Sequence, residues 1–115
     1  MKLHGKLFAA VAVACLMLSA CMAHAQGENR AIRVINRSSS VIFHLYFSNV
    51  DRSTWGPDQL GFFGTISVNH YEDFNVDDGS GHCLYDIRAV LSDGRVAETR
   101  NVNVCTNDSW TVYDK

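Results

Sequence analysis

Two cysteines, Cys83 and Cys105, lie at equal distances from a turn signal, since each is eleven positions from the glycine of Asp93-Gly94. An Asp-Gly pair between segments of alternating apolar residues is a strong signal for a β-hairpin. Such a hairpin would bring both cysteines to the same end, where an oxidising compartment would let them pair. Closing this 23-residue loop would stabilise the fold by roughly 3 kcal/mol. The pattern therefore predicts a hairpin closed by a Cys83–Cys105 disulfide.

A catalytic Cys83, with His82 as its neighbour, is the alternative interpretation of the same residues. Adjacent residues of a strand point to opposite faces, so His82 is badly placed to act as a base for Cys83. The structural disulfide is therefore favoured.

The first 25 residues have the organisation of a secretory signal peptide. Two lysines precede an apolar stretch over residues 7–18, and small residues end the segment at Ala25. The apolar stretch is shorter than the roughly 20 residues that cross a bilayer, which disfavours a transmembrane anchor. We expect cleavage after Ala25 and a periplasmic or secreted domain over residues 26–115.

A second processing signal overlaps the first. Residues 18–21, Leu-Ser-Ala-Cys, resemble a bacterial lipobox, in which the cysteine becomes the lipidated first residue of the mature chain. A multiply acylated Cys21 would hold the domain on a membrane, whereas cleavage after Ala25 releases it. The soluble form is favoured, and a membrane-anchored lipoprotein is the alternative.

The segment expected to remain after cleavage is mildly acidic. Residues 26–115 hold 8 basic and 12 acidic residues, a net charge of −4. Nucleic-acid binding needs a concentrated basic patch, so no nucleic-acid partner is expected. This length supports one domain with a modest core, which a covalent crosslink would help to stabilise.

Short segments of alternating apolar residues follow one another along this domain, as is typical of strands with one buried face. The alternating positions are Ile32 and Val34; Val41, Phe43, Leu45 and Phe47; Ile66 and Val68; Phe74 and Val76; Cys83, Tyr85, Ile87, Ala89 and Leu91; Val96, Val102 and Val104; Trp110 and Val112. The alternation is weak over residues 98–101, where a bulge is expected. No segment has a helical apolar repeat. The pattern predicts an all-β fold, a small antiparallel β-sandwich or open barrel of about seven strands.

The sequence resembles a group of small exported bacterial proteins. That group shares an early Asn before a strand, a Trp-Gly-x-Asp-x-Leu-Gly loop, a Cys-x-Tyr-Asp strand, an Asp-Gly turn and a closing Cys. The matching positions are Asn36, Trp55, Gly56, Asp58, Leu60, Gly61, Cys83, Tyr85, Asp86, Asp93, Gly94 and Cys105. The group has no established activity, so the resemblance implies the fold and export, and leaves function open.

Catalysis is not expected. His44, His70 and His82 are isolated in the sequence, and Gly79-Ser80-Gly81 lacks the flanking pattern of a nucleophile elbow. No cofactor is expected either. A small periplasmic enzyme of the hydrolase type remains the alternative.

A calcium site is a weaker candidate. Asp73, Asn75 and Asp77 place oxygen side chains at alternate positions, as the first half of a calcium loop does. The sixth position is Asp78 instead of glycine, and the twelfth is Leu84 instead of an acid. Three polar residues on the water-facing side of a strand explain the same pattern, and a calcium-dependent binding domain is the alternative.

The loop over residues 48–63 is the best candidate for recognition, because sandwiches bind through their end loops. It holds Arg52, Trp55 and Asp58, an indole between a cation and an acid that could recognise a glycan or an envelope protein. We expect Trp55 to belong chiefly to the fold, covering the open end of the core while Leu60 fills it. The sequence as a whole indicates a non-catalytic binding or structural module of the cell envelope, with membrane contact only if Cys21 is lipidated.

Overall fold

The computed structural model describes residues 29–114 of the chain, and within them it has six β-strands and no helix. The predicted signal peptide and the Cys21 lipidation site lie outside the described residues. The strands are β1 (Ala31–Arg37), β2 (Ile42–Asn49), β3 (Tyr71–Asn75), β4 (Leu84–Leu91), β5 (Val96–Asn103) and β6 (Ser109–Tyr113). The prediction of an all-β fold is confirmed.

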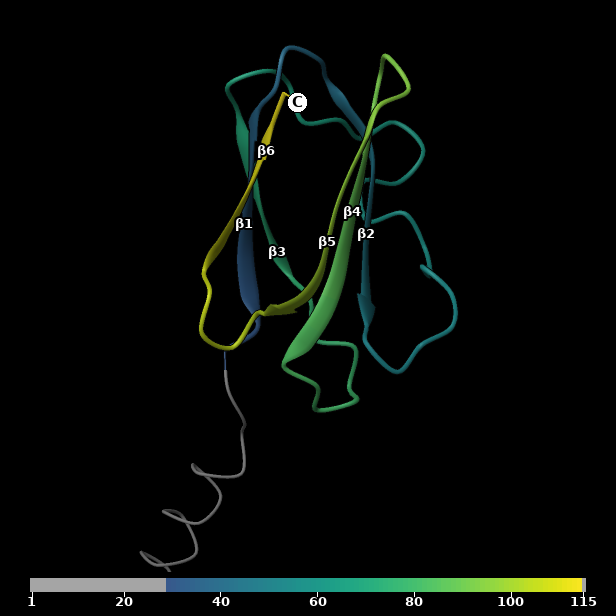
Figure 1. Ribbon diagram of the computed structural model, residues 1–115, viewed down its shortest axis with the longest axis vertical. Coiled ribbons are helices and arrows are strands. Elements are labelled where there is room, and N and C mark those ends of the chain that lie inside the picture. Colours follow the sequence, from purple (N-terminus) through teal and green to yellow (C-terminus); the bar gives the residue numbers. More distant parts are fainter. Residues whose placement is uncertain (1–28, 115) are drawn as a thin grey trace, which may run out of the picture.

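The strands form two three-stranded sheets that lie face to face in a sandwich-like arrangement (Figure 1). One sheet has the order β3-β1-β6, and the other has the order β2-β4-β5. The prediction of antiparallel strands is wrong for one pair: β1 and β6 lie in parallel, while the other described neighbours are antiparallel. The segment around Ile66 and Val68, predicted as a strand, makes a single bridge, between Ile66 and Ile42, so the described residues form six strands, one fewer than the predicted seven.

The core lies between the two sheets and draws buried side chains from both. Its buried members are Ile32, Val34, Ile42, Leu45, Phe47, Ile66, Val76, Tyr85, Ile87, Ala89, Leu91, Val104 and Val112. Burying a side chain of this size contributes roughly 1.5–3 kcal/mol. The face predicted for the fourth strand is confirmed, because Tyr85, Ile87, Ala89 and Leu91 are all at most 4% exposed.

The prediction that Phe43 faces the core is wrong. A β-bulge shifts the register, so that Ile42 pairs with Leu91 while His44 pairs with Val90. The extra residue reverses the alternation at this point, because successive side chains of a strand point to opposite faces. Ile42 is fully buried, and Phe43 is 44% exposed.

The bulge expected in the fifth strand is confirmed. Tyr85 pairs with Val102 and Ile87 with Thr99, so β5 has one residue more than β4 over this stretch. Asn101 takes a left-handed conformation there, with φ of 57°. Asparagine adopts this region more readily than most residues do.

The disulfide closes one end of the β4–β5 hairpin, as predicted. Cys83 and Cys105 are bonded, with their Cα atoms 5.3 Å apart. The Asp93-Gly94 turn closes the other end, with Gly94 at φ of 89°, and the Leu91 amide donates to the Arg95 carbonyl. The spacing of the two cysteines about Gly94 therefore reflects hairpin geometry.

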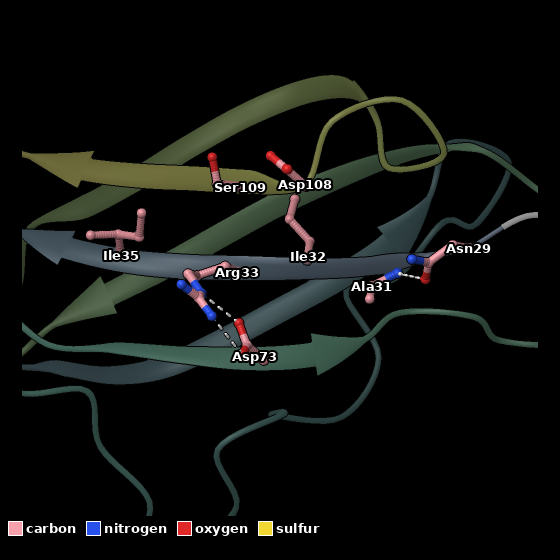
Figure 2. Close-up of a pocket in the computed structure, with 8 residues that line it drawn as sticks. All are labelled: Asn29, Ala31, Ile32, Arg33, Ile35, Asp73, Asp108 and Ser109. Carbon is pink, nitrogen blue, oxygen red and sulfur yellow. Dashed lines mark hydrogen bonds and ion pairs between the residues drawn. The ribbon is translucent and has the colours of Figure 1, made fainter.

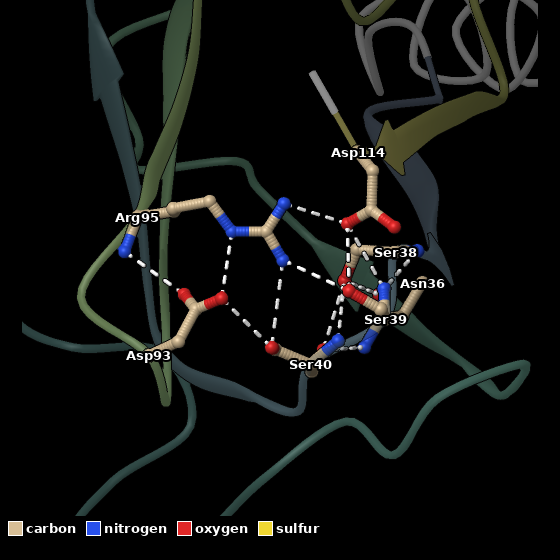
Figure 3. Close-up of polar contacts among 7 residues, drawn as sticks. All are labelled: Asn36, Ser38, Ser39, Ser40, Asp93, Arg95 and Asp114. Atoms are coloured by element: carbon tan, nitrogen blue, oxygen red, sulfur yellow. Dashed lines mark hydrogen bonds and ion pairs between the residues drawn. The ribbon is translucent and has the colours of Figure 1, made fainter.

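A polar network joins the turn of this hairpin to the other sheet (Figure 3). Arg95 donates to Asp93 on its own turn and to Asp114 after β6, both at 2.7 Å. Asp114 also accepts from the Ser39 amide in the turn between β1 and β2. These contacts hold three chain segments together at the end opposite the disulfide.

Removing the disulfide should destabilise the domain without abolishing the fold. We expect the Cys83→Ala, Cys105→Ala double variant to lose about 3 kcal/mol of unfolding free energy, because the unfolded chain regains the entropy of an open loop. Urea unfolding followed by far-ultraviolet circular dichroism measures the loss. A midpoint equal to that of the oxidised wild type, or loss of the β signature, would contradict this prediction.

Candidate functional site

The loop that follows β2 brings two of the three candidate binding residues together. Arg52 and Trp55 line one polar pocket of about 130 Å³. Its full lining is Ser48, Arg52, Ser53, Thr54, Trp55, Asp86 and Arg100. Asp58, the third candidate, does not line this pocket and instead contacts the edge of β2.

Trp55 is partly buried against the outer face of the β2-β4-β5 sheet. Its ring centroid lies 6.4 Å from that of Tyr46. The guanidinium carbon of Arg100 lies 4.9 Å from the indole centroid, and that of Arg88 lies 5.6 Å away. Tyr46 and Arg88 pair across β2 and β4 and point away from the core. Cation–π contacts of this kind contribute roughly 0.5–1 kcal/mol each at exposed sites.

The expectation that Trp55 covers the open end of the core is therefore wrong. Trp55 does not pack against the core cluster, whereas Leu60 does. The loop places the indole on the outside of the sheet, where it covers arginine side chains. One of them, Arg88, has a buried Nε atom without a hydrogen-bond partner.

Arg52 brings a positive charge to the pocket that the described residues leave without a partner. No residue among 29–114 forms an ion pair or hydrogen bond with its guanidinium. The side chain instead lies against Gly56, where an added Cβ would come within 3.1 Å of Nη2. Gly56 has a φ of 72°, so glycine suits this position for both its conformation and its size.

The other charges of the pocket are paired. Asp86 accepts from Arg100 Nη1 and from the Asn101 amide, both at 3.0 Å. Arg100 also forms an ion pair with Glu98 at 3.3 Å, and these contacts raise its pKa. Because the carboxylate of Asp86 is already neutralised, Arg52 gives the pocket its positive character. The Ser53 and Thr54 hydroxyl groups beside it add hydrogen-bond donors.

Asp58 caps the exposed edge of β2. Its carboxylate accepts from the backbone amides of Leu45 and Leu60, both at 3.0 Å, and from His44 Nδ1 at 2.7 Å. Partial burial acts to raise the pKa of Asp58, but these hydrogen bonds outweigh it and lower the pKa. A side chain that occupies a free amide of an edge strand also blocks pairing with another chain.

A second aspartate ties the start of this loop to the β3–β4 loop. Asp51 Oδ2 lies 2.6 Å from His82 Nε2, and Ser80 Oγ lies 2.7 Å from His82 Nδ1. Serine, histidine and aspartate in a row resemble a hydrolase triad. No local pattern of residues predicts it, because Asp51 is 31 residues from His82. However, Ser80 is exposed to water and its Oγ also contacts Asp78. The ring is reversed as well, because the aspartate lies on Nε2 and the serine on Nδ1, opposite to the triad arrangement. The contacts of this cluster are those of a loop anchor.

Asp78 is the centre of that anchor. It accepts from Asn49 Nδ2 at 2.7 Å, from the Tyr85 hydroxyl at 2.9 Å and from the Ser80 amide at 3.0 Å. Partial burial acts to raise the pKa of Asp78, but the hydrogen bonds dominate and lower it far below the ordinary aspartate value. Burial and the bond to Asp78 raise the pKa of Tyr85.

The calcium candidates have other partners. Asp73 receives two hydrogen bonds from Arg33, at 2.8 and 3.2 Å. Asn75 accepts from the Asp77 amide, and Asp77 from the Gly79 amide. No group of three or more acidic, histidine or cysteine side chains among residues 29–114 is arranged to hold a metal ion.

A larger hollow, of about 640 Å³, lies along β1 between Asp73 and Ser109 (Figure 2). The guanidinium of Arg33 lines this hollow, where it donates to Asp73 and lies 3.9 Å from the Tyr71 ring centroid. The positive charge of this open trough is therefore already paired with Asp73, unlike Arg52 in the smaller pocket.

Comparison of the chain with known protein families, with curated proteins and with solved structures gave no match. Within residues 29–114, no helix is long and apolar enough to cross a membrane. The case for function therefore depends on the geometry of the site.

Trp55 should contribute less to stability than a core aromatic residue. We expect Trp55→Ala to cost about 1–2 kcal/mol, since a partly buried ring loses cation–π and packing contacts only. Phe47→Ala, which empties a core position, should cost about 3–5 kcal/mol. Urea unfolding of both variants measures the difference in unfolding free energy. Equal losses for the two variants would contradict the prediction and indicate that Trp55 packs in the core.

Asp78 should make the domain more stable at neutral pH than at acid pH. Because its folded pKa is lowered, its stabilisation is complete above the unfolded value of about 4 and is lost as pH falls below it. Asp78→Asn should therefore cost about 1–3 kcal/mol at pH 7, where Tyr85 loses a strong acceptor, and less at pH 3. Urea midpoints at the two pH values test this, with Asp77→Asn as the matched control. A cost that is the same at both pH values would refute it.

Proposed function

We propose that the protein is an exported, non-catalytic β-sandwich module of the cell envelope that binds an acidic group in the Arg52–Trp55 pocket. The observation that carries this proposal is the guanidinium of Arg52, which has no ion-pair or hydrogen-bond partner among residues 29–114 and lines a pocket with Ser48, Ser53 and Thr54. An arginine presents several N–H donors in a planar fork, which suits the two oxygens of a carboxylate. Arg52 is thus available to a ligand in a way that Arg100, bound to Asp86, is not.

The size of the pocket defines what part of a ligand enters it. At about 130 Å³ it is well below the roughly 300 Å³ at which pockets for whole small molecules begin. It suits a carboxylate at the end of a larger molecule. In the cell envelope that carboxylate can come from an acidic glycan or from a peptide.

Two features support the envelope assignment. The disulfide is typical of proteins that fold in an oxidising compartment outside the cytoplasm. The chain also begins with a segment that has the pattern of a signal peptide. The soluble form is preferred over a lipoprotein anchored through Cys21.

The separate positions of the histidines favour binding over catalysis. His44 is bound to Asp58, His82 to Asp51, and His70 lies 3.0 Å from the Val68 carbonyl. The two acidic partners, Asp58 and Asp51, lie at different places in the loop after β2. General acid–base catalysis would instead require such groups to converge on one pocket.

Binding can be measured by nuclear magnetic resonance on the indole N–H of Trp55, which is next to the pocket. We expect glucuronate and N-acetylglutamate to shift this signal at millimolar concentration, and glucose to leave it unchanged. Arg52→Ala should weaken the response at least tenfold, because the pocket loses its positive charge.

Arg37→Ala is the matched control. Arg37 is an exposed arginine of β1 without an ion pair among residues 29–114, and it lies on the other sheet. Its removal changes the net charge equally and should preserve binding. Shifts by glucose equal to those by glucuronate, or full binding by Arg52→Ala, would overturn the proposal. If glucuronate binds more tightly, the ligand is an acidic glycan. If N-acetylglutamate binds more tightly, the ligand is an acidic peptide.

A further inference from the structure

Two adjacent phenylalanines at the tip of the β2–β3 loop are almost completely exposed. Phe62 is 93% exposed and Phe63 is 91% exposed. Their rings meet edge to face, with centroids 4.8 Å apart. Phe43, which the β2 bulge turns outward, adds a third exposed ring on the same side of the molecule. Contiguous apolar surface of this kind is uncommon on a monomer and usually marks an interaction site.

The backbone holds the two rings outward in a tight turn. Gly61 has a φ of 71°, and an added Cβ on Gly64 would lie 1.9 Å from the Leu60 carbonyl oxygen. Leu60, which begins the turn, packs against the core. Ile66, which follows it, exchanges two backbone hydrogen bonds with Ile42, at 3.0 and 3.1 Å. Because Leu60 and Ile66 anchor both ends of this turn, the two phenylalanine side chains between them project into solvent.

A notch lies beside this projection. It has a volume of about 180 Å³ and is lined by Phe43, His44, Phe62, Phe63, Gly64 and Thr65. A projecting aromatic ring next to an aromatic notch is a self-complementary shape, because a two-fold axis can place the ring of each copy in the notch of the other. Residues 59–71 contain no Asp, Glu, Lys or Arg. His44, which lines the notch, is paired with Asp58 at 2.7 Å, so the two groups offset each other where a second copy would approach.

We propose that this surface, formed by Phe43, Phe62 and Phe63, is the interface of a weak two-fold dimer of the chain. Aromatic side chains bury roughly 150–250 Å² each. Because Phe43 is only 44% exposed, the three rings supply at most about 340–570 Å² per copy. The total for two copies is then about 700–1,100 Å², below the roughly 1,200 Å² of stable specific interfaces and within the range of weak, transient ones. Such a small interface gives a weak, transient dimer, and the Arg52–Trp55 pocket is not part of it.

A lipid bilayer fits the same surface less well. The benzyl groups of Phe62 and Phe63, the two almost fully exposed rings, together contain no more carbon than one myristoyl chain. A single myristoyl chain by itself gives only marginal membrane binding. No lysine or arginine of residues 59–71 adds attraction to anionic lipids.

Analytical ultracentrifugation of the purified exported protein, from 10 µM to 1 mM, tests the proposal. We expect a reversible monomer–dimer equilibrium that the Phe62→Ser, Phe63→Ser double variant weakens at least tenfold. Both side chains are exposed, so the urea midpoint of that variant should equal that of the wild type. The matched control is Tyr113→Ser, which removes a 67% exposed aromatic side chain from β6 and should leave the equilibrium unchanged.

Three results would overturn the dimer. The wild type could remain monomeric up to 1 mM, or the double variant could dimerise as the wild type does. The third is sedimentation with phosphatidylcholine vesicles that depends on Phe62 and Phe63 in a protein that stays monomeric, which would assign the surface to lipid.

Discussion

The fold depends on the buried face of β4. This strand lies in the middle of its sheet, paired with β2 on one side and β5 on the other. Tyr85, Ile87 and Ala89 are at most 1% exposed and form the centre of the core. Apolar burial is the largest favourable term in folding, so the strand with the most regular buried face organises its neighbours. The disulfide and the Asp93-Gly94 turn fix the two ends of the hairpin that contains it.

Side chains complete the structure where backbone pairing ends. β5 and β6 follow each other in the chain but belong to different sheets. Arg95 and Asp114 join them at one end, and the Trp110 indole donates to Thr99 at 3.0 Å between the two strands. Polar contacts of this kind contribute about 1 kcal/mol each, less than the core does, but they define how the sheets are placed relative to each other.

Aspartates have a comparable role in the loops. Asp51, Asp58 and Asp78 each accept a hydrogen bond from a residue at least 13 positions away in the sequence. Together they hold the loop after β2 against β2 itself and against the β3–β4 loop. A loop fixed in this way can keep Arg52 unpaired and two phenylalanines exposed, because its position does not depend on burying them.

The sequence by itself determined the hairpin, the disulfide, the core face of β4 and the bulge in β5. Each follows from local spacing: a period of two, a turn dipeptide, or a break in the alternation. The tertiary structure decided that Phe43 points outward, that Trp55 covers the outside of a sheet, and that Asp58 caps β2 instead of lining the pocket. A single extra residue in β2 reverses which side chains are buried, and alternation alone does not reveal it. The path of the long loop is set by hydrogen bonds between residues far apart in the chain, which form only when the two sheets have already come together.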